Sequence, residues 1–375
     1  MTASDRILTT HVGSLPRPLE LLEAFGFTGN PAPPEQIPGM IADAVKGIVE
    51  MQVEAGIDFI SDGEMSKPGY STYMTERMSG FGGAGRWADM QQDIIEFPDW
   101  GATLVENLDK LPTPACIGDV SYDNTMFVEG DIANFTAAIE PHKNVKGFMP
   151  AASPGVIAMF LENQHYKTHE EYVMALGAAM KTEYDAIHKA GYILQLDCPE
   201  LAVGRAVQFS KMSEKEWHSK IDADVEALNI ATADIPPEAM RMHVCWGNYD
   251  GPHNHDVPFK EIVDLVLSAR PAGILFEGAN PRHEHEWHLW EDTKLPEGKT
   301  LIPGVIDSTN NYIEHPELVA ERIGRYANLV GRENVIAGTD CGFSTFAGYT
   351  PVYPANVEKP QSVPAMKFSR PTRFA

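Results

Sequence analysis

The stretch from Met240 to Glu277 contains two short strand patterns separated by a helix pattern. It reads M-R-M-H-V-C (240–245), then F-K-E-I-V-D-L-V-L-S-A (259–269), then G-I-L-F-E (273–277). Short apolar runs bounded by turn residues are typical of buried strands, and the longer amphipathic run between them is typical of a helix. This order of elements predicts two parallel strands joined by a crossover helix.

The same alternation extends over most of the chain. Strands are expected at Ile7–Val12, Asp58–Ser61, Val145–Met149, Ile193–Asp197, Met240–Cys245, Gly273–Glu277, Leu301–Ile306 and Asn334–Thr339. Clear helix patterns cover Ile41–Ala55, His169–Ala190, Phe259–Ala269 and Pro316–Leu329. Eight strands separated by helices predict an α/β fold of the (β/α)8 or TIM-barrel class. A doubly wound open sheet is the alternative, but it would need a phosphate-binding glycine fingerprint, which the sequence lacks.

We expect a single catalytic barrel domain over residues 1–348. Residues 75–140 carry G-F-G-G-A-G-R-W-A-D-M and are expected to form a long insertion after the second strand, as a lid or an assembly surface. Residues 349–375 contain Pro351, Pro354, Pro360, Pro364 and Pro371, a composition that forbids a normal helix. This segment is therefore expected to be an irregular, atypical C-terminal tail.

Composition narrows the class of protein. The chain has 375 residues, 43% of them hydrophobic, which is ample for a globular core, and no run approaches the ~20 apolar residues of a membrane span. Four cysteines and an N-terminus without signal-peptide features predict a cytoplasmic protein without disulfides. The formal net charge of −24 argues against nucleic-acid and membrane partners. Whether the protein forms a homo-oligomer is left open.

Four residues are candidates for a zinc site. His243 and Cys245 are two positions apart on an expected strand, so their side chains point to the same face. Glu277 and Cys341 end two other expected strands. Zinc binds Cys, His and carboxylate ligands, and a thiol coordinated to it is deprotonated and becomes a strong nucleophile. The alternative for each cysteine is a small buried apolar residue.

Polar or metal-binding residues occur at the ends of nearly all expected strands. They are His11–Ser14, Asp62–Glu64, Pro150–Ser153, Asp197–Cys198, His243–Cys245, Glu277, Asp307–Ser308 and Asp340–Cys341. Barrel enzymes carry their chemistry at the C-terminal ends of the strands. Helix capping would explain the serines, but it does not explain a set of Cys, His and Glu.

Several motifs resemble one family. T-H-V-G-S-L-P-R-P (10–18), S-D-G-E (61–64), Q-L-D-C-P-E-L (195–201), M-H-V-C-W-G-N (242–248), F-E-G (276–278) and A-G-T-D-C-G-F (337–343) look like the catalytic domain of cobalamin-independent methionine synthase. The resemblance implies a barrel enzyme that uses Zn²⁺ held by His243, Cys245, Glu277 and Cys341. It also implies that Ser14, Glu64 and Asp197 bind homocysteine.

The sequence also departs from the family pattern. The chain has no room for the second, N-terminal half of the full-length enzymes, so it resembles a core-only member. The family's D-E-P is D-C-P here, which would put Cys198 beside the site, and the catalytic-acid histidine of D-I-H-S-P is absent from I-D-S-T-N-N-Y (306–312). Possible substitutes are His253, His255, His283 and His285.

The leading hypothesis is a zinc-dependent methyltransferase that converts homocysteine to methionine. The methyl donor, a folate or a methyl-carrying protein, would enter near Trp246, Asn248 and Tyr249, where a flat donor could stack on an aromatic ring. The alternative is an epoxyalkane:coenzyme M transferase-like enzyme, whose sulfonate substrate would favour cations such as Lys67 and Arg205. A third possibility is a non-catalytic zinc protein, although structural zinc sites commonly use C-x-x-C loops.

Overall fold

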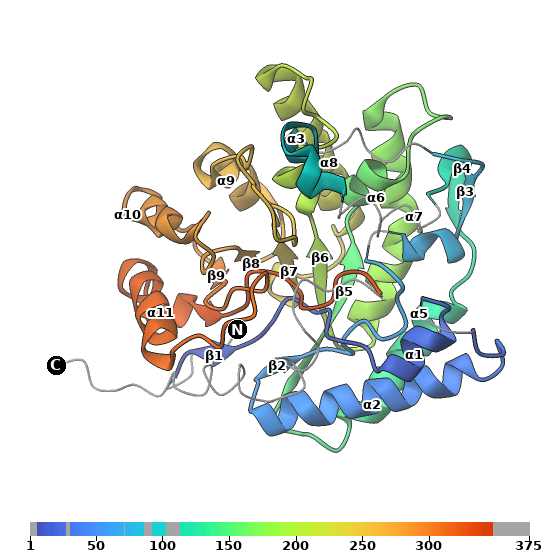
Figure 1. Ribbon diagram of the computed structural model, residues 1–375, viewed down its shortest axis with the longest axis horizontal. Helices are drawn as coiled ribbons and strands as arrows, with labels where there is room; N and C mark the ends of the chain where they lie inside the picture. Colours follow the sequence, from blue (N-terminus) through green and yellow to red (C-terminus); the bar gives the residue numbers. More distant parts are fainter. Residues whose placement is uncertain (1–5, 28–30, 71, 86–91, 103–112, 348–375) are drawn as a thin grey trace.

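The barrel strands are β1 (Leu8–Thr9), β2 (Phe59–Ile60), β5 (Lys146–Ala152), β6 (Ile193–Asp197), β7 (Met240–His243), β8 (Gly273–Phe276), β9 (Thr300–Pro303) and β10 (Ile336–Ala337). The computed structural model describes residues 6–27, 31–70, 72–85, 92–102 and 113–347 (Figure 1). Six strands form one parallel sheet in the order β2-β5-β6-β7-β8-β9, and β1 pairs in parallel with β10.

Two sets of contacts close this sheet into a barrel. The Asp58 N–H donates to the Thr9 carbonyl, 3.2 Å away, and joins β1 to β2. Parallel bridges between Leu301 and Val335 and between Gly304 and Gly338 join β9 to the β10 segment. The eight strands therefore follow one another around the barrel in chain order, and the predicted (β/α)8 fold is confirmed.

The helices are α1 (Leu19–Ala24), α2 (Ile37–Ala55), α3 (Gln92–Glu96), α5 (Met126–Ile139), α6 (Pro154–Phe160), α7 (His169–Lys189), α8 (Glu214–Ala231), α9 (Phe259–Ser268), α10 (Leu289–Asp292) and α11 (Pro316–Val330). The four helices predicted from the sequence correspond to α2, α7, α9 and α11, and their ends lie close to the expected residues. Local capping explains several starts. Ser213 and Glu216 form a capping box at α8, and Ser153 caps α6 directly before a proline.

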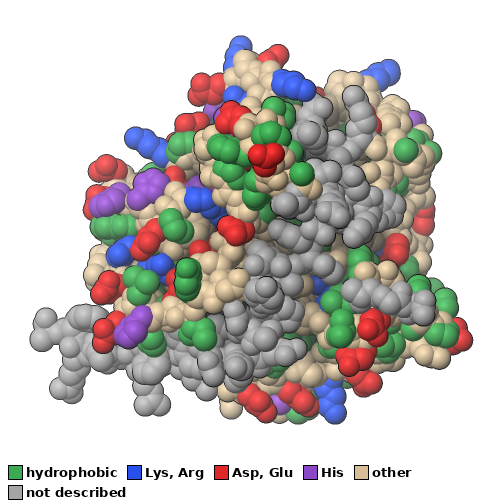
Figure 2. All heavy atoms as spheres, in the orientation of Figure 1, with side chains coloured by type: hydrophobic (Ala, Val, Ile, Leu, Met, Phe, Trp, Pro, Cys, Tyr) green, Lys and Arg blue, Asp and Glu red, His purple; other side chains and the backbone are tan. Residues whose placement is uncertain are grey.

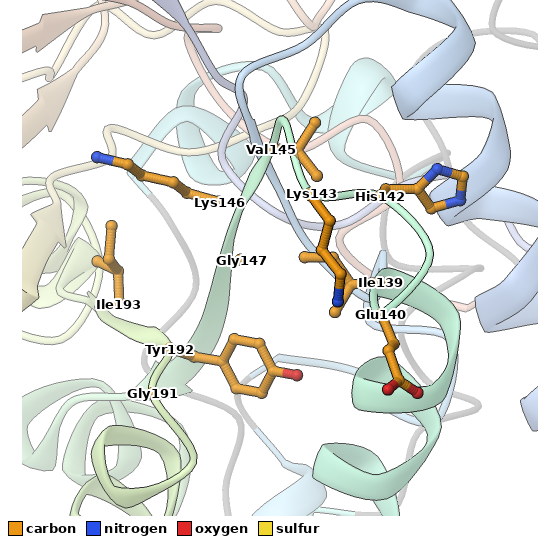
Figure 3. A pocket seen from close by; sticks show the side chains of 10 residues that line it. All are labelled: Ile139, Glu140, His142, Lys143, Val145, Lys146, Gly147, Gly191, Tyr192 and Ile193. Carbon is orange, nitrogen blue, oxygen red and sulfur yellow. The ribbon is translucent and has the colours of Figure 1, made fainter.

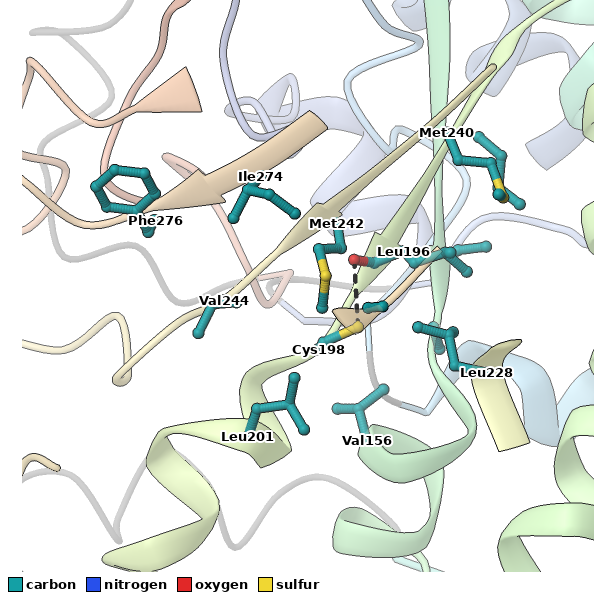
Figure 4. Packing of buried hydrophobic residues seen from close by; sticks show 14 of the residues in the cluster. Val156, Leu196, Cys198, Leu201, Leu228, Met240, Met242, Val244, Ile274 and Phe276 are labelled. Carbon is teal, nitrogen blue, oxygen red and sulfur yellow. Dashed lines mark hydrogen bonds between the residues drawn. The ribbon is translucent and has the colours of Figure 1, made fainter. Parts of the chain in front are cut away.

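Along β7, successive side chains point alternately to the hydrophobic core and into the barrel. Met240, Met242 and Val244 are fully buried in the main hydrophobic cluster, where they pack with residues of the surrounding helices (Figure 4). The intervening residues point the other way, into the barrel, as the bonds of Arg241 to Gln195 and Thr10 show. His243 follows the same alternation, so the period of a strand places it inside the barrel.

Cys198 meets an expectation only in part. Its thiol lies 3.6 Å from the Leu196 carbonyl within the apolar cluster of Figure 4, and only 1% of the residue is exposed. The residue lies beside the site, since its N–H donates to the His243 carbonyl at 2.8 Å, but its thiol packs in the hydrophobic cluster and does not point into the barrel. Burial raises its pKa well above the usual range of a thiol.

The stretch expected as an insertion over residues 75–140 contains two different structures. An antiparallel hairpin of β3 (Met78–Gly82) and β4 (Ala115–Tyr122), with α3 between its strands in sequence, stands beside the barrel (Figure 1). Helix α5 contacts both α2 and α7 and leads into β5, so it belongs to the ring of barrel helices. The expected tail, residues 349–375, lies outside the described residues.

Two features of the composition, the excess of acidic residues and the lack of a long apolar run, can be compared with the structure. Acidic side chains lie scattered among Lys and Arg on the face shown in Figure 2 and do not form a single patch. Within the described residues, no helix has both the length and the apolar character needed to cross a membrane.

An open pocket of about 390 Å³ lies where β5 and β6 begin (Figure 3). Its lining includes Lys143 and Lys146 before and at the start of β5, and Tyr192 just before β6. This is the N-terminal edge of the strands, whereas barrel enzymes place their chemistry at the C-terminal edge. We therefore assign this pocket no part in the candidate site.

Candidate metal centre and substrate pocket

Three buried side chains meet at the C-terminal ends of the strands. The ligand atoms of His243, Cys245 and Cys341 all lie within 4.8 Å of one another. The two sulfur atoms are 3.6 Å apart, too far for a disulfide bond of about 2 Å, and both thiols are free. Nε2 of His243 is buried and has no hydrogen-bond partner among the residues that the structure describes, which leaves this nitrogen available as a ligand.

This donor set fits zinc. An imidazole nitrogen and two thiols are ligands that Zn²⁺ prefers. The other ring nitrogen of His243, Nδ1, lies 3.5 Å from Asp197 Oδ1, and a neighbouring carboxylate is the usual support of a metal-bound histidine. The hydrogen bond with Cys245 and burial raise the pKa of the Cys341 thiol well above its usual range, so a cation is needed to hold it as a thiolate.

Glu277, the expected fourth ligand, lies next to this group but is not part of it. Its charge acts on Cys341, yet its carboxylate is not among the atoms that lie within 4.8 Å of one another. Oε1 accepts from the Trp246 backbone N–H at 2.8 Å. Oε2 accepts from Asn280 Nδ2 at 2.7 Å and from Arg282 at 2.8 Å. The role of Glu277 as a metal ligand stays a prediction.

Asp340 fixes the backbone next to Cys341 and next to Glu277. Its Oδ1 accepts from the N–H groups of Gly278 and Ala279, and its Oδ2 accepts from the N–H of Asn280, at 2.8 to 2.9 Å. Asp340 directly precedes Cys341, and these N–H groups directly follow Glu277. One buried carboxylate therefore holds the ends of β8 and β10 in register.

Ser14 lies against the residue that follows Cys341. A Cβ atom on Gly342 would collide with the Ser14 hydroxyl, so only glycine permits this approach. The N–H of Phe343 donates to the Ser14 carbonyl at 2.9 Å, which ties the two loops together. The structure thus brings Ser14 to the metal-centre loop, while its binding of a substrate carboxylate stays a prediction.

Glu64 and Asp197 form a buried acidic pair beside His243. Oε2 of Glu64 is buried and has no hydrogen-bond partner in the described ranges, and the residue has a left-handed φ of 58°. Burial raises the pKa of Glu64 to about 7, with a smaller contribution from Asp197. Asp197 Oδ1 accepts from Gln195 at 2.8 Å. A substrate ammonium would relieve the repulsion and provide the missing donor.

Trp246 and Asn248 are already engaged. The Trp246 ring is fully buried, packs at 4.4 Å from the His283 ring, and donates to the Val257 carbonyl. The donor-stacking role expected for this ring therefore lacks a free face. Asn248 donates to the Gly342 carbonyl at 2.8 Å and accepts from Ser308 at 3.1 Å, so it links three loops of the site.

The structure also shows the surroundings of the histidines that were considered as substitutes for the catalytic acid. Both ring nitrogens of His253 and of His283 have partners, and Asp256 is a partner of both residues. His255 pairs with Glu96 at 2.8 Å, and His285 is exposed. In this arrangement the rings of His253 and His283 hold loops together and have no free nitrogen for a substrate.

The comparison with known proteins agrees with this geometry. Residues 7–352 match the sequence profile described as cobalamin-independent synthase, catalytic domain. The chain belongs to this family. The family match spans all three metal-centre residues and Glu277, Ser14, Glu64 and Asp197.

Relatives with this synthase domain differ in their reactions. The chain is 25% identical over 337 residues to a methionine synthase of Sulfolobus acidocaldarius, covering 89% of this chain and 85% of that protein. It is 24% identical to a 2-hydroxypropyl-CoM lyase of Xanthobacter autotrophicus, covering 92% and 90%. A solved B12-independent methionine synthase from Shewanella sp. W3-18-1, in complex with selenomethionine, shares the fold with a TM-score of 0.73, 21% identity and 96% coverage of both chains.

Sequence reasoning missed several residues of this synthase domain. Arg282 and Asp256 form an ion pair behind Glu277, at 2.7 Å. Arg241 donates to Gln195, which in turn donates to Asp197. A buried cation therefore supports the Asp197 carboxylate through Gln195. The strand period could have indicated Arg241, because it lies two residues before His243. Arg282 and Asp256 are on loops, where sequence carries no such period.

Proposed function

We propose that this protein is a zinc-dependent thiol methyltransferase that converts homocysteine to methionine. The observation that carries the proposal is the combination of a thiol-imidazole cluster, with the unpartnered Nε2 of His243, and a buried acidic pair beside it. The first fits a metal that binds a substrate thiol, and the second fits an ammonium group on the same substrate.

In this proposal, one set of residues would bind the metal and another set would bind the amino acid. His243, Cys245 and Cys341 would hold the Zn²⁺ ion, with Glu277 as the predicted fourth ligand. Bound zinc would supply a positive charge that keeps the substrate sulfur deprotonated at neutral pH. The other residues act on the amino acid itself.

Glu64 and Asp197 would accept hydrogen bonds from the substrate ammonium, and Ser14 would donate to its carboxylate. Holding the amino acid at both groups fixes the direction in which its thiol points. Gln195, backed by Arg241, keeps one oxygen of Asp197 occupied and so leaves the other to the ligand.

The methyl donor would be a folate or a methyl-carrying protein. A 5-methyltetrahydropteroyltriglutamate–homocysteine methyltransferase of Bacillus cytotoxicus is 24% identical over 340 residues, but this chain covers only 40% of that protein. The donor therefore stays open, whereas the buried carboxylates of Glu64 and Asp197 support an amino-acid thiol as the acceptor.

The resemblance to a 2-hydroxypropyl-CoM lyase makes a sulfonate thiol the second candidate substrate. Both expected sulfonate-binding cations already donate to backbone carbonyls, and the charge of Lys67 also lowers the pKa of Glu64. Lys67 donates to the Pro150 carbonyl at 2.5 Å and is 4% exposed, and Arg205 donates to the Phe209 carbonyl at 2.7 Å. The unpartnered oxygen of Glu64 would repel a sulfonate, so the pocket favours homocysteine.

The test compares the two thiols in zinc-loaded protein. The protein should accelerate the formation of methionine from homocysteine and a methyltetrahydropteroyltriglutamate above the rate of the same mixture without protein, as measured by mass spectrometry. Coenzyme M with epoxypropane should give no adduct. Cys245→Ser should abolish the reaction, whereas Cys116→Ser, at a buried thiol on β4, should leave it intact. Adduct formation with coenzyme M and none with homocysteine would replace this proposal by the lyase-like alternative.

A further inference from the structure

Arg282 connects Glu277, the predicted fourth metal ligand, to Asp256, which lies on a loop outside the candidate site. One terminal nitrogen donates to Glu277 Oε2 at 2.8 Å, and the other donates to Asp256 Oδ2 at 2.7 Å. The Arg282 side chain is 18% exposed, and the Glu277 side chain is 1% exposed. A planar guanidinium that bridges two carboxylates in this way fixes the orientation of both.

The hydrogen bonds on Glu277 leave only part of its carboxylate available. A carboxylate has about four acceptor positions, two on each oxygen. Oε2 already accepts from Arg282 and from Asn280, whereas within the described part of the chain Oε1 accepts only from the Trp246 N–H. The remaining acceptor position is therefore on Oε1, the oxygen bonded to the residue that follows Cys245.

Asp256 is itself held from two sides. His283 contacts its Oδ2 at 3.0 Å, and the ring of His283 packs against Trp246. The loop that carries Asp256 is also held by Asp93 of α3, whose Oδ2 accepts from the Tyr249 hydroxyl and from the His253 N–H. The support behind Arg282 thus extends from the site to the helix between the hairpin strands.

We propose that Arg282, supported by Asp256, is a positioning residue for Glu277. By occupying Oε2 it keeps the carboxylate from turning and presents Oε1 to the thiol cluster. The inference rests on the proposed metal centre and adds a residue to which neither the sequence motifs nor the family match assigns a role. Outer partners of this kind typically change metal affinity 10- to 100-fold when they are removed.

The experiment measures zinc affinity by competition with a chromophoric chelator, together with the absorption spectrum of the Co²⁺-substituted protein. Arg282→Gln should weaken zinc binding roughly 10- to 100-fold and change the Co²⁺ spectrum, because Glu277 loses its fixed orientation. Arg282→Lys should show a smaller loss, since one ammonium group cannot bridge Glu277 and Asp256 as a guanidinium does. The matched control is Arg325→Gln, which removes an arginine paired with Glu284 at 2.9 Å, away from the site.

A double-mutant cycle separates positioning from general structural damage. If Arg282 acts through Glu277, then Glu277→Gln combined with Arg282→Gln should bind zinc about as weakly as Glu277→Gln alone. Additive losses, or wild-type affinity and an unchanged Co²⁺ spectrum in Arg282→Gln, would overturn the inference. Failure of the unmodified protein to bind zinc, or zinc binding unaffected by Cys245→Ser, would instead remove the metal centre on which the proposed function depends.

Discussion

At the residue scale, two residues of the candidate site each have a buried side-chain atom without a hydrogen-bond partner among the described residues. These atoms are His243 Nε2 and Glu64 Oε2. A buried polar atom without a partner costs about 1–3 kcal/mol, and more when it is charged. A ligand that completes both atoms would remove this cost, which is what the proposed metal centre and ammonium pocket require.

The cysteines give the first prediction. Cys245→Ser or Cys341→Ser should lower zinc affinity by at least 100-fold, because a hydroxyl is a much poorer zinc ligand than a thiolate. Zinc content after dialysis, measured by mass spectrometry, checks this. Cys116→Ser changes a buried thiol on β4 and should leave one zinc per chain; loss of zinc in this control would mean that general unfolding explains the result.

Glu64 gives a prediction about pH. Burial raises its pKa from the ordinary 4.5 to about 7, and only the ionised form attracts an ammonium. Homocysteine affinity should therefore rise as pH increases through about 7. Because the folded state holds this proton more tightly, the group's contribution to stability is present below pH 4.5 and is lost as pH rises through 7.

Isothermal titration with homocysteine between pH 5.5 and 8.5, on zinc-loaded protein, would test this dependence. Glu64→Gln should bind roughly 10-fold more weakly at the high end and lose this step in the pH profile, since a charged hydrogen bond is worth about 1.5–3 kcal/mol. Glu50→Gln, on an exposed position of α2, should reproduce the unmodified profile. A profile in Glu64→Gln identical to that of the unmodified protein would assign the ammonium to Asp197 alone.

At the scale of elements, the ends of β8, β9 and β10 depend on close backbone contact. Gly304, directly after β9, faces Asp340: a Cβ atom there would collide with Asp340 Oδ1 and lie 2.7 Å from its Cα. Asp340 also holds the N–H groups that follow Glu277. A methyl group at Gly304 would thus push apart the two strand ends that carry Cys341 and Glu277.

Gly304→Ala should therefore destabilise the fold by about 1–3 kcal/mol and weaken zinc binding together with it. Urea unfolding and zinc competition measure the two effects. The matched substitution is Gly324→Ala on α11, where a Cβ atom meets nothing within 4 Å. There we expect unchanged zinc affinity and stability higher by up to about 1 kcal/mol, because alanine favours a helix. Equal effects at both glycines would contradict the role given to the Asp340 contact.

At the scale of the whole molecule, closure of the barrel creates the site. His243 and Cys341 are 98 positions apart in the chain, yet their ligand atoms meet within 4.8 Å because β7 and β10 belong to one closed ring of strands. A ligand shared by these strand ends should stabilise the entire barrel, since it binds the folded state and not the unfolded one.

Removal of zinc should accordingly lower the free energy of unfolding. When free zinc exceeds its dissociation constant a thousand-fold, the loss on removal is about 4 kcal/mol. Urea unfolding of chelator-treated and zinc-loaded protein gives the difference. Cys245→Ser should unfold at the same urea concentration with and without zinc; a zinc-dependent shift in this variant would place the stabilising metal elsewhere.

The sequence by itself predicted the eight barrel strands, four of the helices and the shared face of His243 and Cys245. Strand and helix periods are local, so β6 and the start of α7 lie at the residues expected, and the spacing of His243 and Cys245 required both to point into the barrel. The order of the eight strands followed from their alternation with helices.

Only the tertiary structure decided which side chains of the motifs can contact a ligand. Trp246 and Cys198 stand in motifs beside functional residues, yet both are buried in packing, because alternation and loop paths turn them away from the site. The helix α5 and the partners Arg282 and Asp256 were missed for a related reason, and the contacts of Asp340, expected only as a polar residue at a strand end, were not foreseen. Their roles depend on contacts between distant segments, and no local period or propensity in a single sequence records such contacts.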